Sequence, residues 1–364
     1  MTRTGSLPFI AGSSSVSAEV TAVYSGPTAT VVEAGLVSTG TALKTRTLSV
    51  AAALVGLAGG TVLVGWFGFD RVLAAALSVG WLGFAALIPW QGVVFVLLGL
   101  AWWALLPRRH PIRVLIGARM VRDAVTNCLP LSAVGGFVLG MRAANLGGLS
   151  WPMASASTLA DVTAEFLSQL AFAAGGLALL IPRKPGLRLI ILFAAGIALG
   201  VVAGALFIVM QHGSAKIMER LSQRFRFTWL ASLAARAASV QRELAQIYSS
   251  VPRLGATFLL HLAAWIANGV GSWLIMQFTG ARIGLADALA IEGLLQAALT
   301  VAFAVPGFAG VQELAYVGLG GLFGLAPDAA IAVSLVRRAR DVIVGVPILL
   351  VWQMIEAKRL APRG

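Results

Sequence analysis

Residues 189–210 read LIILFAAGIALGVVAGALFIVM, a stretch of 22 residues without a charged side chain or a proline. A helix needs about 20 mainly apolar residues to cross the hydrocarbon core of a bilayer, so this stretch predicts a membrane-spanning helix. Five further stretches of spanning length are apolar over most of their residues, near 48–68, 82–106, 155–181, 254–278 and 328–356. Together they predict an all-α integral membrane protein with six full spans.

The composition agrees with a chain that lipid mostly surrounds. Of the 364 residues, 59% are hydrophobic and 11% are charged, whereas a soluble domain carries about 25% charged residues. These proportions exclude an ordinary soluble enzyme. The single cysteine, Cys128, excludes a disulfide framework and a thiolate metal site, and the three histidines are scattered, so we expect no metal and no cofactor. The basic residues form no tract interleaved with aromatic residues, so we expect no nucleic-acid partner.

The distribution of charge predicts which ends of the chain face the cytoplasm. The net charge is +13, and Lys and Arg concentrate in the cytoplasmic loops of membrane proteins. Basic residues follow the second span, fill the linker 211–253 and occupy the tail 358–364. We therefore predict cytoplasmic termini, a disordered tail over residues 1–47, and amphipathic linker helices that lie on the inner leaflet. The basic link at Arg183 and Lys184 then falls outside, against the rule.

Two segments, 112–147 and 285–325, carry glycine and proline where a lipid-facing helix would not tolerate them. Irregular backbone at membrane depth is allowed only where protein or a water-filled cavity satisfies its polar groups. We therefore predict two broken or re-entrant helical hairpins in addition to the six spans. The residues predicted to interrupt the helices are Pro130, Gly135, Gly136, Pro306, Gly307 and Gly310.

An internal repeat emerges when the chain is shifted against itself by 176 residues. The shift superposes Pro130 on Pro306, Gly148 on Gly324, and Asp161 on Arg337. The predicted topology makes the two units, 112–181 and 285–356 of a membrane domain over 48–357, inverted copies, as in many transporters. Because the matches are mainly Gly, Pro, Ala and Leu in a chain rich in these residues, chance similarity is the alternative.

Two acidic residues lie on one face of the third span. Asp161, Glu165 and Gln169 are spaced four residues apart and so point in one direction. An unpaired charge at the centre of a spanning helix costs about 2.5–3.5 kcal/mol, so these acids need partners or a wet cavity. We favour a substrate or proton pathway, and the alternative is a structural ion pair.

The last span carries three arginines and an aspartate. The three arginines need anions to compensate their charge inside the membrane. The phosphate of a lipid headgroup is one candidate, since the guanidinium group matches its geometry; protein carboxylates are the other. Arg122 has the alternative role of a cationic anchor at the headgroups, and Glu313 that of a helix cap. The candidate substrate-binding residues are Arg122, Asn127, Arg142, Asp161, Glu165, Glu313, Arg337, Arg340 and Asp341.

The order of these motifs resembles a known family. The run Arg122-Asp123-Ala-Val-Thr-Asn127-Cys-Leu-Pro130 and the later Pro306-Gly307-x-x-Gly310-x-x-Glu313 are similar to the flippase-like family of the lysylphosphatidylglycerol synthase membrane region. Within it, Gly80-Trp81 and the first run look most like the HpnL branch, which is associated with hopanoid gene clusters. The resemblance covers about residues 48–357.

What the resemblance implies is a bacterial inner-membrane lipid translocase or lipid-export component, acting on a polar or anionic lipid such as an anionic phospholipid or a hopanoid. It does not imply aminoacylation, because the soluble catalytic domain of the lysyl-transferring members would not fit in this chain, so we expect no enzyme activity. Two alternatives remain open. One is a membrane-embedded lipid-modifying transferase that uses Asp161 or Glu165 as a base, and the other is a docking partner that holds lipid biosynthesis enzymes through the linker 211–253.

Overall fold

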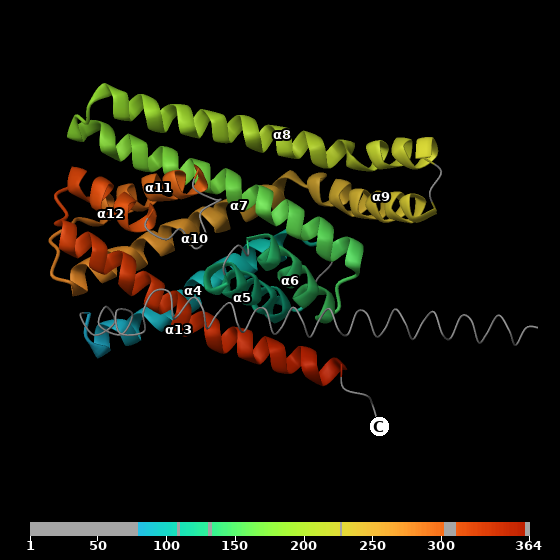
Figure 1. Cartoon of the computed structure of the whole chain (residues 1–364), viewed down its shortest axis with the longest axis horizontal. Helices are drawn as coiled ribbons and strands as arrows, with labels where there is room; N and C mark the ends of the chain where they lie inside the picture. The colour runs from blue at the N-terminus through green and yellow to red at the C-terminus, as the bar shows by residue number, and fades with distance from the viewer. Residues whose placement is uncertain (1–78, 108–109, 130–132, 226–227, 302–310, 361–364) are drawn as a thin grey trace, which may run out of the picture. The chain divides into compact units, whose positions relative to one another are not determined.

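The structure is a computed structural model that describes residues 79–107, 110–129, 133–225, 228–301 and 311–360. This part of the chain contains ten α-helices, one 3₁₀ turn, η1 (Ile181–Arg183), and no strand, so the prediction of an all-α protein is confirmed (Figure 1). The helices are α4 (Trp81–Leu105), α5 (Ile112–Cys128), α6 (Ala133–Leu146), α7 (Trp151–Leu180), α8 (Leu187–Phe225), α9 (Thr228–Tyr248), α10 (Val251–Phe278), α11 (Leu285–Val301), α12 (Val311–Leu322) and α13 (Pro327–Leu360).

Four helices are long and apolar enough to cross a membrane. They are α4, α7 continued by η1, the Leu187–Gln211 part of α8, and α10, and they coincide with four of the predicted spans. The sixth predicted span is the helix α13, whose internal charges keep it out of this group. The predicted tail 1–47 and the span near 48–68 lie outside the described residues.

Both predicted interruptions lie between short helices. At about 1.5 Å per residue, the 17 residues of α5 and of α11 reach roughly 25 Å, and their companions α6 and α12 are shorter still. None of the four arms alone matches a hydrocarbon core of about 30 Å.

One part of this prediction needs correction. Gly135 and Gly136 were expected in the first interruption, but they lie inside α6, which begins at Ala133. A Cβ atom on Gly136 would come 2.8 Å from the backbone oxygen of Arg122. Gly136 therefore permits close packing of α6 on α5 instead of breaking a helix. Pro130, Pro306, Gly307 and Gly310 lie outside the described residues.

The two halves share one order of described elements, a 17-residue helix, a short helix and a long helix. The junction before the long helix matches in detail at the predicted shift of 176 residues. Gly148 has φ +108° and Gly324 has φ +82°. In both, the next residue closes the turn, Leu149 N donating to Ala144 O at 3.2 Å and Leu325 N to Gly320 O at 2.9 Å. This shared C-terminal cap supports the repeat over chance similarity.

The long helices of the two units run in opposite directions. In Figure 1 the chain follows α7 from right to left and α13 from left to right. The hairpin α11–α12 lies at the left end of the helices, whereas α5–α6 lies towards their right half. This arrangement agrees with an inverted repeat whose broken hairpins enter from opposite sides.

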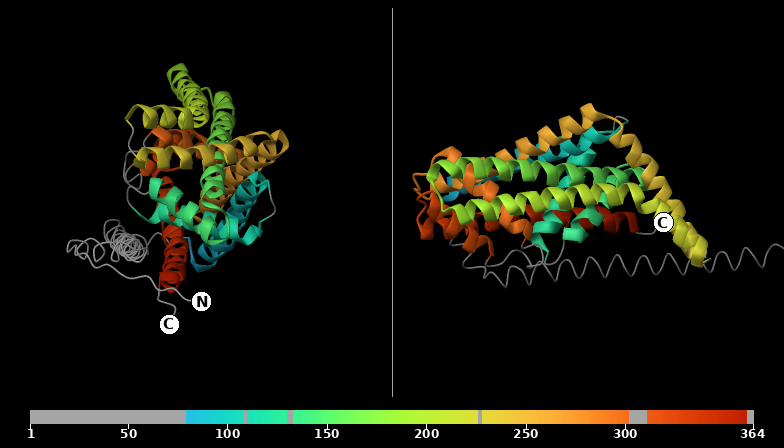
Figure 2. Two further views of the ribbon diagram at one scale, coloured as in Figure 1. Left: turned by 90° about the vertical axis from the view of Figure 1, so that its right-hand side faces the viewer. Right: turned by 90° about the horizontal axis from the view of Figure 1, so that it is seen from above.

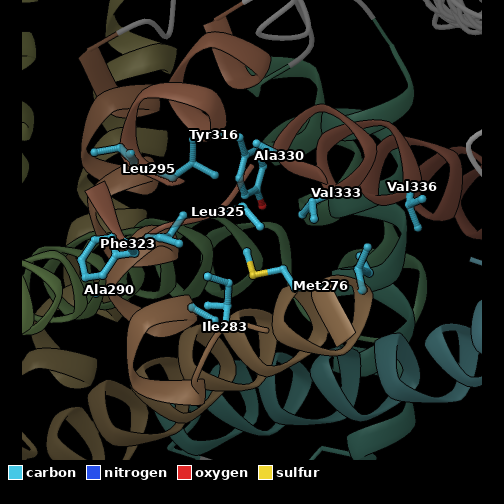
Figure 3. Packing of buried hydrophobic residues seen from close by; sticks show 14 of the residues in the cluster. Met276, Ile283, Ala290, Leu295, Tyr316, Phe323, Leu325, Ala330, Val333 and Val336 are labelled. Carbon is cyan, nitrogen blue, oxygen red and sulfur yellow. The ribbon is translucent and has the colours of Figure 1, made fainter. Parts of the chain in front are cut away.

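A buried apolar cluster holds the second unit against α10. It includes Met276 of α10, Leu295 of α11, Tyr316 of α12 and Val333 of α13, all fully buried (Figure 3). By contrast, α8 exposes leucine and valine side chains such as Leu192 and Val202. An all-apolar exposed surface of this kind suits contact with lipid.

The described residues of the linker 211–253 are mostly helical. Its first part continues α8, which runs without interruption from Leu187 to Phe225. The chain then returns along α9, and the two helices pack as a hairpin (Figure 2). Tyr248 at the end of α9 donates a hydrogen bond to Gln211 Oε1 at 2.7 Å, and this bond joins the end of α9 to α8. The predicted contact of the linker with the inner leaflet stays a prediction.

Candidate functional site

The acidic face of α7 meets two arginines of α5. Asp161 Oδ2 lies 2.7 Å from Nη1 of Arg122 and 3.1 Å from Nη1 of Arg119. Glu165 Oε2 lies 2.5 Å from Nη2 of Arg122 and 2.9 Å from Nη1 of Arg119, and its other oxygen also bonds Arg119. Charge-assisted bonds of this kind compensate carboxylates that are withdrawn from water.

The same cluster contains a histidine from α10 and a third carboxylate. His261 is fully buried, and its Nε2 lies 2.9 Å from Asp161 Oδ1. Asp123 lies one turn after Arg119 and contacts its Nε at 3.0 Å. The cluster thus brings together two arginines, three carboxylates and one histidine from α5, α7 and α10.

A second group of charges lies between α11, α12 and α13. Arg337 Nη1 lies 2.5 Å from Glu292 Oε2 and 2.9 Å from the hydroxyl of Tyr316. The Tyr316 hydroxyl also donates to Glu292. Arg337 therefore has its carboxylate on the short helix α11 and not on α7.

The neighbouring arginines of α13 have separate partners. Arg338 Nε lies 2.8 Å from Glu313 Oε1, so Glu313 joins α12 to α13. Arg340 contacts the next residue, Asp341, with Nη2 2.8 Å from Oδ1.

A cavity of about 270 Å³ separates the two groups of charges. Eight of the ten described helices contribute to its wall, all except α8 and α9. The first unit supplies Arg119, Arg122 and Glu165, and the second supplies Arg337 and Arg340. Ionisable side chains from two distant stretches of the sequence thus converge on one polar hollow.

Local packing fixes the orientation of Arg122 at this cavity. Because Gly136 lets α6 approach α5, the ring of Phe137 comes to lie 4.5 Å from the guanidinium carbon of Arg122. One face of the guanidinium therefore packs on an aromatic ring while its edge bonds Asp161 and Glu165. Gln169 of α7 donates to Thr300 of α11 at 3.0 Å and links the two units.

Most candidate residues from the sequence reach this cavity, and three do not. Arg122, Asn127, Glu165, Arg337, Arg340 and Asp341 line it. Asp161 lies behind the wall, with no exposed surface, and bonds the lining arginines.

Arg142 and Glu313 need correction as cavity residues. Arg142 is 33% exposed and bonds Glu356 of α13 at 2.9 Å, because it lies near the end of α6, five residues after Phe137, the α6 residue that lines the cavity. Glu313 lies in the first turn of α12, as expected, but turns towards Arg338 and is not in the cavity wall.

Several residues of the site had no decisive signal in the sequence. Arg119 has the appearance of a headgroup anchor, yet it is 3% exposed and bonds three carboxylates. Gln91 and Trp265 look like ordinary residues of spanning helices, but both line the cavity. The available signals were His261 inside an apolar span and Glu292 one turn before Gln296. Among the described residues, no group of His, Cys, Asp and Glu has the arrangement of a metal site.

Comparison with known proteins identifies the family. Residues 49–348 match the family described as the lysylphosphatidylglycerol synthase TM region. The chain belongs to this family. This membership makes it a multi-pass membrane protein of lipid metabolism or transport, and the family resemblance seen in the sequence is confirmed.

A relative from an archaeon covers most of the same region. A UPF0104 membrane protein of Methanothermobacter thermautotrophicus (strain ATCC 29096 / DSM 1053 / JCM 10044 / NBRC 100330 / Delta H) is 25% identical over 287 residues, which are 76% of this chain and 84% of the relative. No solved structure matches the chain. The finer resemblance to the HpnL branch stays a prediction.

Proposed function

We propose that this protein is a lipid translocase that lets the polar headgroup of a lipid cross the membrane through the cavity while the acyl chains stay in hydrocarbon. The observation that carries the proposal is a cavity of about 270 Å³ that is lined by ionisable and amide side chains from both predicted repeat units. Ionisable side chains inside a membrane domain are costly, and where they face a cavity they typically mark a substrate or ion pathway.

The depth of the cavity supports this function. Glu165 is the fifteenth of the 30 residues of α7, so it lies close to the middle of a spanning helix. Gln91 is the eleventh of the 25 residues of α4 and lines the same space. Substrate sites of transporters with inverted repeats lie near the bilayer midplane, where broken helices meet.

The ion pairs favour transport over chemistry at the acidic residues. A general base takes up a proton from its substrate. Asp161 and Glu165 each bond both Arg119 and Arg122, and Asp161 also contacts His261. A transferase that uses either residue as its base would protonate a carboxylate that two arginines hold in its charged form, which weakens these bonds.

The proposed location is the bacterial inner membrane with cytoplasmic termini. The helix directions bring the end of α4, the start of α10 and the end of α13 to one side (Figure 1). Basic residues follow or occupy these ends, including Arg113, Arg253, Lys358 and Arg359. This concentration is typical of the cytoplasmic side. The proposed partners are membrane lipids, and docking of lipid biosynthesis enzymes on the α8–α9 hairpin stays a prediction.

The experiment compares two neutralised ion pairs in proteoliposomes. In the test variant Arg337→Gln and Glu292→Gln are combined, because removing both charges avoids an uncompensated buried group. In the control variant Arg183→Gln and Asp287→Asn neutralise a pair with a 2.6 Å contact outside the cavity. Transfer of fluorescent polar lipids between leaflets is followed by quenching from outside with dithionite.

We expect the wild type and the control to transfer lipid and the test variant to lose at least about tenfold in rate, the loss that corresponds to about 1.4 kcal/mol. Equal transfer rates in all three proteins would rule out the cavity as the pathway. If the wild type transfers no polar lipid faster than protein-free vesicles do, the translocase function itself is ruled out.

A further inference from the structure

The charges around the cavity leave no surplus of positive charge for a phosphate group. Four arginines line it, Arg119, Arg122, Arg337 and Arg340. Each bonds at least one carboxylate, and the carboxylates number five, namely Asp123, Asp161, Glu165, Glu292 and Asp341. Even a protonated His261 brings this set only to neutrality. An anionic headgroup would have to displace a carboxylate from its arginine.

Carboxamide side chains make up a second chemical feature of the wall. Five of them line the cavity from five different helices, Gln91 of α4, Asn127 of α5, Asn268 of α10, Gln296 of α11 and Gln312 of α12. A carboxamide both donates and accepts hydrogen bonds, whereas a guanidinium only donates and a carboxylate only accepts. Hydroxyl groups have this same dual character, so the amides match them without adding charge.

The side-chain oxygen of Gln91 has no hydrogen-bond donor among the described residues. Gln91 is 8% exposed and lines the cavity. Its Oε1 atom is buried and accepts no hydrogen bond from the described residues. Buried polar atoms in native proteins nearly always have a partner, so this oxygen requires a donor from water or from a ligand.

The size and remaining wall of the cavity suit a compact group. The volume of about 270 Å³ is near the lower limit of about 300 Å³ for pockets that hold drug-sized ligands. Trp265 and Phe137 add aromatic surface to the polar wall. The electron-rich face of an aromatic ring attracts the C–H groups of a sugar or polyol.

From the amide wall, the unpartnered Gln91 oxygen and the absence of surplus positive charge, we propose that the cavity binds an uncharged, hydroxyl-rich lipid headgroup, a glycosyl or polyol group. This assignment rests on the proposed translocase function and names the class of its substrate. The amides exchange hydrogen bonds with the hydroxyl groups, and the ion pairs stay intact during passage.

The test measures lipid preference with the full chain in proteoliposomes. Three probes carry the same fluorescent acyl chain, monoglucosyldiacylglycerol as the uncharged probe, phosphatidylserine as the anionic one, and phosphatidylcholine as the zwitterionic one. We expect transfer of the glucosyl lipid to be at least about tenfold faster than that of the other two, equivalent to about one net hydrogen bond. A polyol lipid with an uncharged headgroup distinguishes a requirement for a sugar ring from one for hydroxyl groups alone.

The outcomes separate this inference from the proposed function. If phosphatidylserine is transferred as fast as the glucosyl lipid or faster, the preference for a hydroxyl-rich headgroup is wrong, whereas the proposed translocase function is still supported. Transfer of none of the probes would overturn both. A preference for the glucosyl or polyol probe supports both.

A single substitution tests the role of Gln91. Gln91→Leu keeps a similar side-chain volume. It deprives no described residue of a hydrogen bond to Gln91 Oε1, because this oxygen has no partner among them. We expect this substitution to slow transfer of the glucosyl lipid about tenfold. Gln246→Leu, the same change at an exposed position of α9, is the control and should leave the rate unchanged. A wild-type rate in Gln91→Leu would contradict the inference.

Discussion

Arg122 of α5 bonds Asp161 of α7 at 2.7 Å, and both side chains are almost completely withdrawn from solvent. This bond fixes the first broken hairpin to the middle of a spanning helix. It also shows that a charge in this chain can be satisfied inside the protein and not at the membrane surface. The two residues therefore belong to the structure of the cavity as well as to its chemistry.

Removing one member of this cluster should destabilise the protein strongly. Arg122→Gln leaves Asp161 and Glu165 with Arg119 as their remaining arginine, and an uncompensated buried charge costs about 3–5 kcal/mol. Arg183→Gln is the control, because Arg183 is half exposed in its pair with Asp287 and such pairs contribute about 0–1 kcal/mol. Thermal unfolding of the detergent-solubilised variants, followed by tryptophan fluorescence, measures both. Equal midpoints would show that the cluster is dispensable for stability.

The contact between α5 and α6 should tolerate no side chain at Gly136. The Cβ of Gly136→Ala would lie 2.8 Å from the backbone oxygen of Arg122, so the hairpin must open, at about 1–3 kcal/mol. Gly117→Ala on α5 meets nothing within 4 Å and should be neutral or stabilising by up to about 1 kcal/mol. Unfolding in increasing concentrations of dodecyl sulfate compares the two. If Gly136→Ala is as stable as Gly117→Ala, the close approach of the helices is absent.

The repeat predicts matched effects at the two junction glycines. Gly148 and Gly324 both have positive φ, a conformation that costs a residue with a Cβ atom roughly 1–2 kcal/mol. We expect Gly148→Ala and Gly324→Ala each to lower stability by about this amount, measured by thermal unfolding. Gly175→Ala, inside α7 with no atom within 4 Å of the new Cβ, is the control. A loss at one junction but not at the other would contradict a shared cap.

The single cysteine offers a probe of the hairpin in the folded protein. Cys128 is 1% exposed, and its sulfur lies 3.6 Å from the backbone oxygen of Asp341. Because labelling requires local opening, we expect a maleimide to react at least about 100-fold more slowly with the folded protein than with the protein in dodecyl sulfate. Mass spectrometry over time measures both rates. Rapid labelling of the folded protein would show that the α5–α13 contact opens freely.

Hydropathy was sufficient to predict the spanning helices. The helices α4, α7, α8 and α10 coincide with apolar stretches because a segment in lipid must satisfy its backbone internally and cover itself with apolar side chains. The end of α5 at Cys128 was also predictable, since a residue that precedes a proline disfavours the helical conformation, and Leu129 before Pro130 is extended. The role of Gly136 was not predictable, because a glycine in a helix contact and a glycine in a break have the same sequence signature.

The candidate site could be predicted only in part. The spacing of Asp161 and Glu165 placed both acids on one face, and that face does point into the protein. The partner of Arg337 could not be deduced, since Glu292 lies 45 residues earlier and comes near it only because α11 and α13 both pack on α10 and α12. Arg142 has the same residue type as Arg122, but its position near the end of α6 directs it to Glu356.

The sequence by itself determined that the chain lies in a membrane and that it is helical, because these properties follow from local hydropathy and backbone chemistry. Only the tertiary structure decided which carboxylate neutralises which arginine, and that amides from five helices surround one cavity. Such pairings join residues far apart in the chain, and their free energy depends on distance and burial, which exist only once the helices have packed.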